Sequence, residues 1–106
     1  MADLEMKVDG GVATMTMNRS EARNALSIEM RSLMDKLFHQ VECDNAVRCV
    51  VLEGAGDHFM SGGDVKSMDE FLHSHDESDI QSYFLHRIHD LHTIMFSMRR
   101  MPKPIV

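Results

Sequence analysis

The residues with the clearest chemical potential form a glycine-rich loop, GAGDHFMSGGDVK, at positions 54–66. A short apolar run, CVVL, precedes the loop, and a stretch of helical character begins at Val65. Strand, loop and helix start in this order leave backbone N–H groups without internal partners, and such groups attract negative charge. Gly62 and Gly63 lack Cβ atoms, so a ligand can approach their peptides closely. A developing oxyanion could therefore sit against the Gly63 N–H, but the glycines alone favour the alternative, a tight turn before a helix.

Three segments resemble one protein family. The sequence FMSGGDVKSM at residues 59–68 resembles the first oxyanion-loop motif of the crotonase (enoyl-CoA hydratase/isomerase) superfamily. MNRSEARNALS at residues 17–27 and PKPIV at residues 102–106 are similar to two further segments of that family, in the same order. Ser20 stands where proline is usual, a departure that we expect to be harmless. The resemblance implies the α/β class, as the N-terminal part of a crotonase-like spiral of ββα units, and a domain over 1–106 that is incomplete at its C-terminus.

The resemblance also implies a role for individual positions. Gly63 would supply one backbone N–H of an oxyanion hole, which stabilises the enolate formed from an acyl thioester. The second donor and the catalytic glutamates come later in the family's sequences, and no residue of this chain corresponds to them. The implied CoA-binding residues are Ala22, Arg23, Ala25, Ser61, Gly62, Gly63, Asp64, Val65 and Lys66.

The side chains around the loop have competing interpretations. Arg23 and Lys66 would bring positive charge near the CoA phosphates, although Lys66 fits a solvated helix position equally well. We expect Asp64 to cap the following helix rather than to act as a general base. Met60 and Met68 flank the loop and could contact an acyl chain, whereas most of the 11 methionines are expected in the core. His58 is not expected to be a base.

Hydration of a trans-2-enoyl-CoA is the first function that the resemblance implies, with double-bond isomerisation second. A 3-hydroxyacyl-CoA hydrolase and a non-catalytic CoA-binding or assembly module remain as alternatives. No cofactor is expected beyond the CoA moiety of the substrate. The family implies a homotrimer or hexamer for a full-length protein.

Composition excludes several other classes. The formal charge is −6 and no basic stripe appears, which argues against nucleic acid as a partner. The apolar runs are too short to span a bilayer, and the N-terminal sequence MADLEM lacks the features of a signal or transit peptide, so a cytoplasmic location is expected. Cys43 and Cys49 are expected to be free, buried thiols. No metal site is expected, because His86, His89 and His92 lack the i, i+4 spacing of a helical zinc site.

Local patterns predict the elements that position the loop. Alternation predicts strands at residues 4–8 and 12–17 joined by a glycine turn, and the apolar run at 47–52 predicts a parallel strand buried on both faces. Ser27 should cap a helix with an apolar stripe that frays near Asp44. A polar, mobile stretch at 73–77 should precede a helix that starts with a Ser78/Gln81 capping box and ends at Pro102. Its core stripe is expected to be Phe84, Ile88, Leu91, Met95 and Met98. Residues 104–106 read as the start of another strand.

Overall fold

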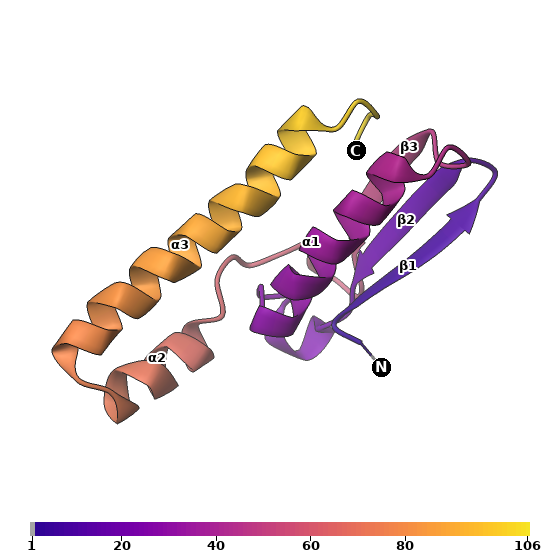
Figure 1. Cartoon of the computed structure of the whole chain (residues 1–106). Coiled ribbons are helices and arrows are strands. Elements are labelled where there is room, and N and C mark those ends of the chain that lie inside the picture. The colour runs from indigo at the N-terminus through magenta and orange to yellow at the C-terminus, as the bar shows by residue number, and fades with distance from the viewer. Residues whose placement is uncertain (1) are drawn as a thin grey trace.

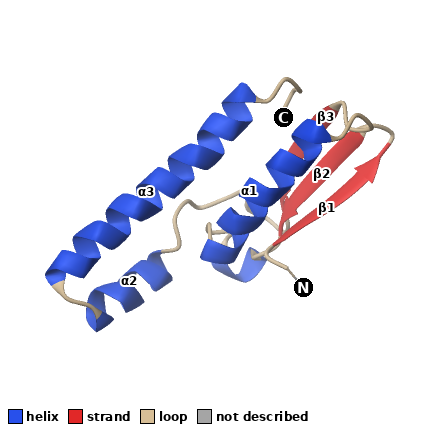
Figure 2. Ribbon diagram, viewed as in Figure 1, coloured by secondary structure: helices blue, strands red, loops and turns tan. Residues whose placement is uncertain are grey.

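The computed structural model describes residues 2–106 as a mixed α/β arrangement of strands and helices (Figures 1 and 2). In chain order the elements are β1 (Leu4–Asp9), β2 (Val12–Met17), the 3₁₀ helix η1 (Ser20–Ala22), α1 (Ile28–Cys43), β3 (Cys49–Gly54), α2 (Val65–Ser74) and α3 (Glu77–Arg100). The strands form one sheet in the order β1-β2-β3. Helix α1 lies between this sheet and α3, as Figure 1 shows.

The first two strands form the predicted hairpin. β1 and β2 pair antiparallel, from Leu4 opposite Met17 to Asp9 opposite Val12. Gly10 and Gly11 have φ angles of 57° and 82°, as a two-residue turn with positive φ at both positions requires. The alternation directs Ala13, Met15 and Met17 to the core, where all three are fully buried.

Strands β2 and β3 pair in parallel, as predicted, from Val12 opposite Cys49 to Met17 opposite Gly54. Parallel neighbours need a crossover connection, and α1 provides it. The strand begins two residues later than the sequence suggested, and the prediction of burial on both faces is wrong. Only Val50 of β3 is fully buried, whereas Val51 is half-buried and Glu53 is exposed. An apolar run alone therefore overstated how much of this strand is covered.

Helix α1 begins where its cap predicts. The Ser27 hydroxyl accepts a hydrogen bond from Met30 N at 3.0 Å, and the helix ends at Cys43, close to the expected position. Lys103 Nζ donates to the Asp44 carbonyl at 2.7 Å and also to the Val41 carbonyl, which places a cation at the negative end of the helix. This contact holds the C-terminal segment against α1.

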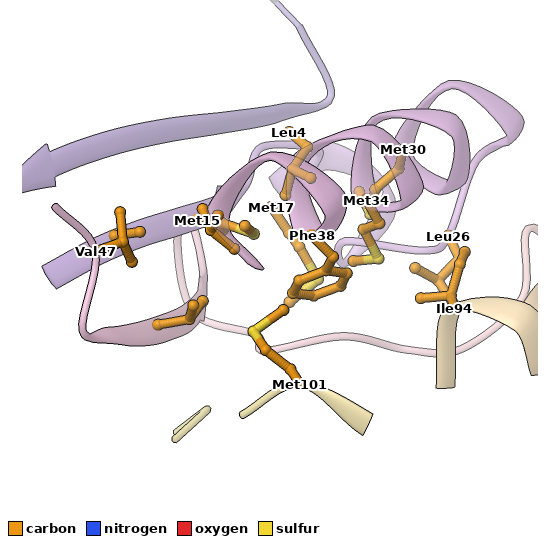
Figure 3. Packing of buried hydrophobic residues seen from close by; sticks show 13 residues of the cluster. Leu4, Met15, Met17, Leu26, Met30, Met34, Phe38, Val47, Ile94 and Met101 are labelled. Atoms are coloured by element: carbon orange, nitrogen blue, oxygen red, sulfur yellow. The ribbon is translucent and has the colours of Figure 1, made fainter. Parts of the chain in front are cut away.

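The hydrophobic core lies where α1 packs against β2 and β3, with α3 closing one side (Figure 3). Figure 3 shows Phe38 of α1 pointing toward Met101, which follows α3. Phe38 is 1% exposed. It was not part of the stripe predicted for this helix, which consisted of Leu26, Met30, Leu33, Met34, Leu37 and Val41. The cluster consists of Leu4, Ala13, Met15, Met17, Leu26, Met30, Met34, Phe38, Val41, Val47, Val50, Ile94 and Met101. Methionine thus fills much of the space between layers, as expected of a flexible apolar side chain.

Helix α3 turns a different face to the core than predicted. Ile88 and Met95, two members of the expected stripe, are 49% and 45% exposed. The buried positions are instead Arg87, Ile94 and Ser97. Leu91 and Met98, which were in the expected stripe, do pack against the core. The capping-box prediction is also wrong, since α3 starts at Glu77 after Asp76 and Ser78 lies inside the first turn.

The two ends of α3 connect it to the rest of the fold. At its start, the Phe71 ring stacks on Tyr83 with centroids 3.7 Å apart, which holds α2 against α3. Part of the stretch predicted to be polar and mobile is helical, because α2 continues to Ser74. At its end, α3 stops at Arg100, before Pro102, as predicted. Val50 N then donates to Pro104 O at 2.9 Å and Val106 N to Val50 O at 3.0 Å, so the expected final strand begins beside β3.

Candidate functional site

The candidate site is formed by two loops that follow neighbouring parallel strands. One loop follows β2 and contains η1; the other follows β3 and leads into α2. Because the strands are parallel, both loops leave the same edge of the sheet. Leu26 N donates to the Gly62 carbonyl at 2.8 Å, within an isolated parallel bridge between Leu26 and Gly63. The structure therefore brings together the two segments that the sequence singled out.

Asn24 locks these loops to each other. Its side chain is fully buried, and its Oδ1 accepts from Arg19 N at 2.9 Å within the first loop. Its Nδ2 donates to Ala55 O at 3.0 Å and His58 O at 2.7 Å in the second loop. Asn24 has a φ angle of 56°, a left-handed conformation that asparagine tolerates better than most residues. The sequence interpretation placed the segment that contains Asn24 along the CoA channel but gave the Asn24 side chain no role in joining the loops.

Gly54, the last residue of β3, must be glycine because the second loop folds back closely over it. A Cβ at this position would lie 2.4 Å from the carbonyl oxygens of both His58 and Phe59. It would also lie 2.8 Å from Asn24 Nδ2. Since backbone atoms cannot move aside as a flexible side chain can, only glycine allows residues 55–59 to fold back over the end of the strand.

The Gly63 N–H is free in this arrangement. The bridge to Leu26 uses the carbonyl of Gly62, and in a parallel pairing of this pattern Gly63 directs its own N–H away from its partner. Among residues 2–106, no acceptor satisfies this N–H. Gly62 supports the turn with a φ angle of 105°, which favours glycine. A Cβ on Gly63 would lie 2.7 Å from Met68 Cε, so the Met68 side chain ends directly against this peptide.

Asp64 does not cap α2 with its side chain, so that prediction is wrong. Its carboxylate lies 3.6 Å from Arg19 Nη2 and makes no capping hydrogen bond. Arg19 also donates from Nη1 to Ala25 O at 2.7 Å, and its Nε lies 3.8 Å from the Asp3 carboxylate. The charge on Asp64 therefore helps to hold Arg19 between the loops. The expectation that Asp64 is structural rather than a base agrees with this placement.

The other predicted CoA-binding residues differ in exposure. Arg23, Ser61, Val65 and Lys66 are exposed, and Ala22 is half-buried. Within the described chain, neither the Arg23 nor the Lys66 side chain forms an ion pair or hydrogen bond. Ala25 is buried. Its N–H donates to Ala22 O at 3.1 Å, and its carbonyl accepts a hydrogen bond from Arg19. Ala25 thus lies beneath the loop surface, while the four exposed residues are open to a ligand.

The remaining reactive side chains form no second centre in the part of the chain that the structure describes. No group of three or more His, Cys, Asp or Glu residues could hold a metal ion there. Cys43 is free and exposed, contrary to the expectation of a buried thiol, and Cys49 is free and half-buried. No helix within residues 2–106 combines the length and apolar character needed to cross a membrane.

Comparisons with known proteins agree with the fold and identify its family. The family model for enoyl-CoA hydratase/isomerase matches residues 12–106. The chain is 36% identical over 100 residues to trans-2-decenoyl-acyl-carrier-protein isomerase of Streptococcus mutans, covering 93% of this chain and 36% of that protein. It is 45% identical over 58 residues to an enoyl-CoA hydratase of Mycobacterium tuberculosis, covering 55% of this chain and 22% of that protein.

The solved structures give the same result in three dimensions. An enoyl-CoA hydratase of Mycobacterium smegmatis superposes with a TM-score of 0.80 at 31% identity, covering 99% of this chain and 38% of that chain. An enoyl-CoA hydratase/isomerase of Xanthobacter autotrophicus superposes with a TM-score of 0.82 at 28% identity. The chain thus spans 36% of the S. mutans relative and a similar share of these structures. Sequence and fold together show that the chain belongs to the enoyl-CoA hydratase/isomerase family and has the N-terminal part of the crotonase fold.

Proposed function

We propose that the Gly63 N–H is one of two backbone donors that bind the carbonyl oxygen of an acyl thioester. The observation that carries this proposal is the free N–H of Gly63, held in a loop that Asn24 and Arg19 fix from both sides. A donor that is fixed before the substrate arrives loses little free energy to reorganisation when charge develops on the oxygen. The loop is therefore suited to stabilise an enolate or a related oxyanion.

The proposed reaction is the hydration of a trans-2-enoyl-CoA. Attack of water at the β-carbon moves negative charge onto the thioester oxygen, where the Gly63 N–H would meet it. The second donor and the acid/base carboxylates have no counterpart in residues 1–106, so this chain supplies substrate binding and one half of the oxyanion hole. The proposed chemistry needs no cofactor other than the CoA moiety of the substrate.

The exposed residues around the loop are proposed to bind CoA. Arg23 and Lys66 are exposed cations without a protein partner within residues 2–106, so both are available to the CoA phosphates. Ala22, Ser61 and Val65 would contact the remainder of the CoA molecule, together with the backbone of Gly62 to Asp64. Ala25 contributes through its carbonyl, which positions Arg19 beneath the loop.

Isomerisation of a double bond is the second candidate, because the S. mutans relative that covers 93% of this chain is an isomerase. Hydration and isomerisation share the oxyanion and differ in the carboxylates that move protons. Supplying a full-length enzyme that contains this chain with a trans-3-enoyl-CoA separates the two reactions. Faster conversion of this substrate to the trans-2 isomer than hydration of crotonyl-CoA would favour the isomerase.

The carrier of the acyl group can be tested in the same assay, because that relative acts on an acyl-carrier-protein thioester. The proposal expects a higher kcat/KM for the CoA thioester than for the same acyl group on an acyl carrier protein. A higher kcat/KM for the acyl-carrier-protein thioester would make that protein, rather than CoA, the proposed carrier. The proposed role of Gly63 would not change.

A matched pair of variants tests the role of Gly63. Gly63→Ala and Gly63→Pro both add a Cβ against Met68 Cε, at a position 2.7 Å from it, but only proline removes the N–H. In a full-length enzyme that contains this chain and supplies the second donor and the carboxylates, turnover of crotonyl-CoA by Gly63→Pro should fall by on the order of 10²–10³ relative to Gly63→Ala if the N–H binds the oxyanion. Thermal melting of both variants controls for loss of fold. Turnover by Gly63→Pro within about threefold of that by Gly63→Ala would show that the Gly63 N–H is not an oxyanion donor.

A further inference from the structure

A cavity of about 290 Å³ lies between α1 and α3. None of the residues assigned to the thioester site lines it. In Figure 1 the two helices that form its walls run side by side. The walls consist of Ile28, Arg31, Ser32, Asp35, Tyr83, His86, Arg87, Asp90, Thr93 and Ile94. This volume is near the lower limit for small-molecule pockets, so the space suits a small ligand.

Two arginines in this wall are unusually buried. Arg31 is 9% exposed and Arg87 is 6% exposed. Arg31 Nη1 donates to the Arg87 carbonyl at 3.0 Å, and Arg87 Nη1 donates to Ser67 Oγ at 3.1 Å and to the Tyr83 hydroxyl. Within residues 2–106, Arg31 Nε, Arg87 Nε and Arg87 Nη2 are buried and have no hydrogen-bond partner. Three donors of two charged groups are thus left unsatisfied, and burial without a partner is costly for such groups.

The negative charges near these arginines do not neutralise them. Burial is the main cause that lowers the pKa of Arg31, and the neighbouring charge of Arg87 lowers it further, while Tyr83 and Asp90 act in the opposite direction. Neither Asp35 nor Asp90 forms an ion pair with a guanidinium group. The Asp35 side chain is 50% exposed and lies 3.7 Å from His39 Nδ1, and Asp90 and His86 are exposed. One carboxylate oxygen of the wall, Asp35 Oδ1, is also buried without a hydrogen-bond partner among the described residues, but it forms no ion pair with either guanidinium group.

We propose that this cavity binds a small anion through a carboxylate or phosphate group that accepts hydrogen bonds from Arg31 and Arg87. The planar fork of a guanidinium group matches both kinds of oxyanion, and the unused nitrogens include two of Arg87. Ile28 and Ile94 line the same space and offer apolar contact to a short organic body. This site stands independently of the thioester site, because no residue is shared between them.

The most direct test follows the arginine Nε–H resonances of the wild-type protein by NMR. Inorganic phosphate and acetate are titrated separately, each against sodium chloride at equal ionic strength. We expect saturable shifts of the Arg31 and Arg87 resonances. Arg99 and Arg100, exposed residues of α3, serve as internal controls and should not show saturable shifts. Shifts with phosphate alone, or with acetate alone, would identify the oxyanion that the site prefers. Shifts of equal size at all four arginines that do not saturate with anion concentration would indicate an adventitious ion only and overturn the proposal.

A second measurement compares a variant of the buried Arg87 with a variant of the exposed Arg99. Phosphate at tenfold its dissociation constant should raise the Tm of the wild type by roughly 5 °C or more, since the ligand binds only the folded state. Arg99→Gln should keep this rise because Arg99 lies on the exposed face of α3, and Arg87→Gln should lose it. The Tm difference with and without phosphate is compared within each variant, so a lower starting stability of Arg87→Gln does not matter. An equal rise in all three proteins would contradict the site.

Discussion

At the scale of single residues, Asn24 determines the geometry of the proposed thioester site more than any residue predicted to touch the substrate. It satisfies one N–H in its own loop and two carbonyls in the loop that carries Gly63. The resemblance identified Gly63, and the motif that carried it included Asn24. The partners of Asn24 lie 31 and 34 residues away, however, and no local spacing reveals contacts at that distance. The structural role of Arg19 escaped the sequence interpretation for the same reason.

Replacing Asn24 should therefore destabilise the protein strongly. Asn24→Ala leaves the Arg19 N–H and the carbonyls of Ala55 and His58 without their partner in a partly buried place. We expect the free energy of unfolding in urea to fall by about 2–4 kcal/mol, since each unsatisfied buried group costs on the order of 1–3 kcal/mol. Asn45→Ala in the exposed turn after α1 is the control and should change little. Equal stability of the two variants would show that Asn24 does not hold the loops.

At the scale of elements, sequence signals succeeded where the cause is local. Positive φ at Gly10 and Gly11 makes the hairpin, the Ser27 hydroxyl starts α1, and Pro102 follows the end of α3. The face of α3 was predicted wrongly because apolar residues lie on two sides of this helix. Packing against α1 selects Ile94 and buries Arg87, while Ile88 remains exposed. Which of two apolar faces is covered depends on the neighbouring helix, and the spacing within α3 does not encode it.

Two serines provide a matched test of helix capping. Ser27 accepts from Met30 N, whereas Ser78 was predicted as a cap and instead lies inside α3. Ser27→Ala should reduce the free energy of unfolding by about 1 kcal/mol, and Ser78→Ala should leave it nearly unchanged. Urea denaturation of both variants measures the difference. A larger effect at Ser78 than at Ser27 would contradict the assigned helix starts.

At the scale of the whole molecule, the described chain is elongated. Its extents are 49 × 28 × 19 Å and its radius of gyration is 15.1 Å, whereas a compact chain of this length would have about 13 Å. Figure 1 shows that α2 and the adjoining end of α3 reach beyond α1. Helix α2 has no buried residue, and α3 exposes apolar side chains at Leu85, Ile88, Met95 and Phe96. The sheet, in contrast, gains pairing from residues 104–106 beside β3.

This uneven packing predicts uneven stability. Backbone amides of β2 should exchange hydrogen only on global unfolding, because β2 is the central strand and its Ala13, Met15 and Met17 side chains are buried in the core. Amides of α2 should exchange at least about 100-fold faster, through local opening of a helix with few buried contacts. Native-state hydrogen exchange followed by NMR measures both sets in one sample. Similar protection of α2 and β2 would show that the helical pair is held more firmly than its burial indicates.

A crystal structure of the protein with a bound acyl-CoA would test whether the Gly63 N–H binds the thioester oxygen. We expect a distance of about 2.7–3.1 Å between Gly63 N and the thioester carbonyl oxygen. We also expect the loop to keep the Leu26–Gly62 hydrogen bond and the contacts of Asn24 described above. A thioester oxygen bound elsewhere, with the Gly63 N–H directed at another group, would contradict the account.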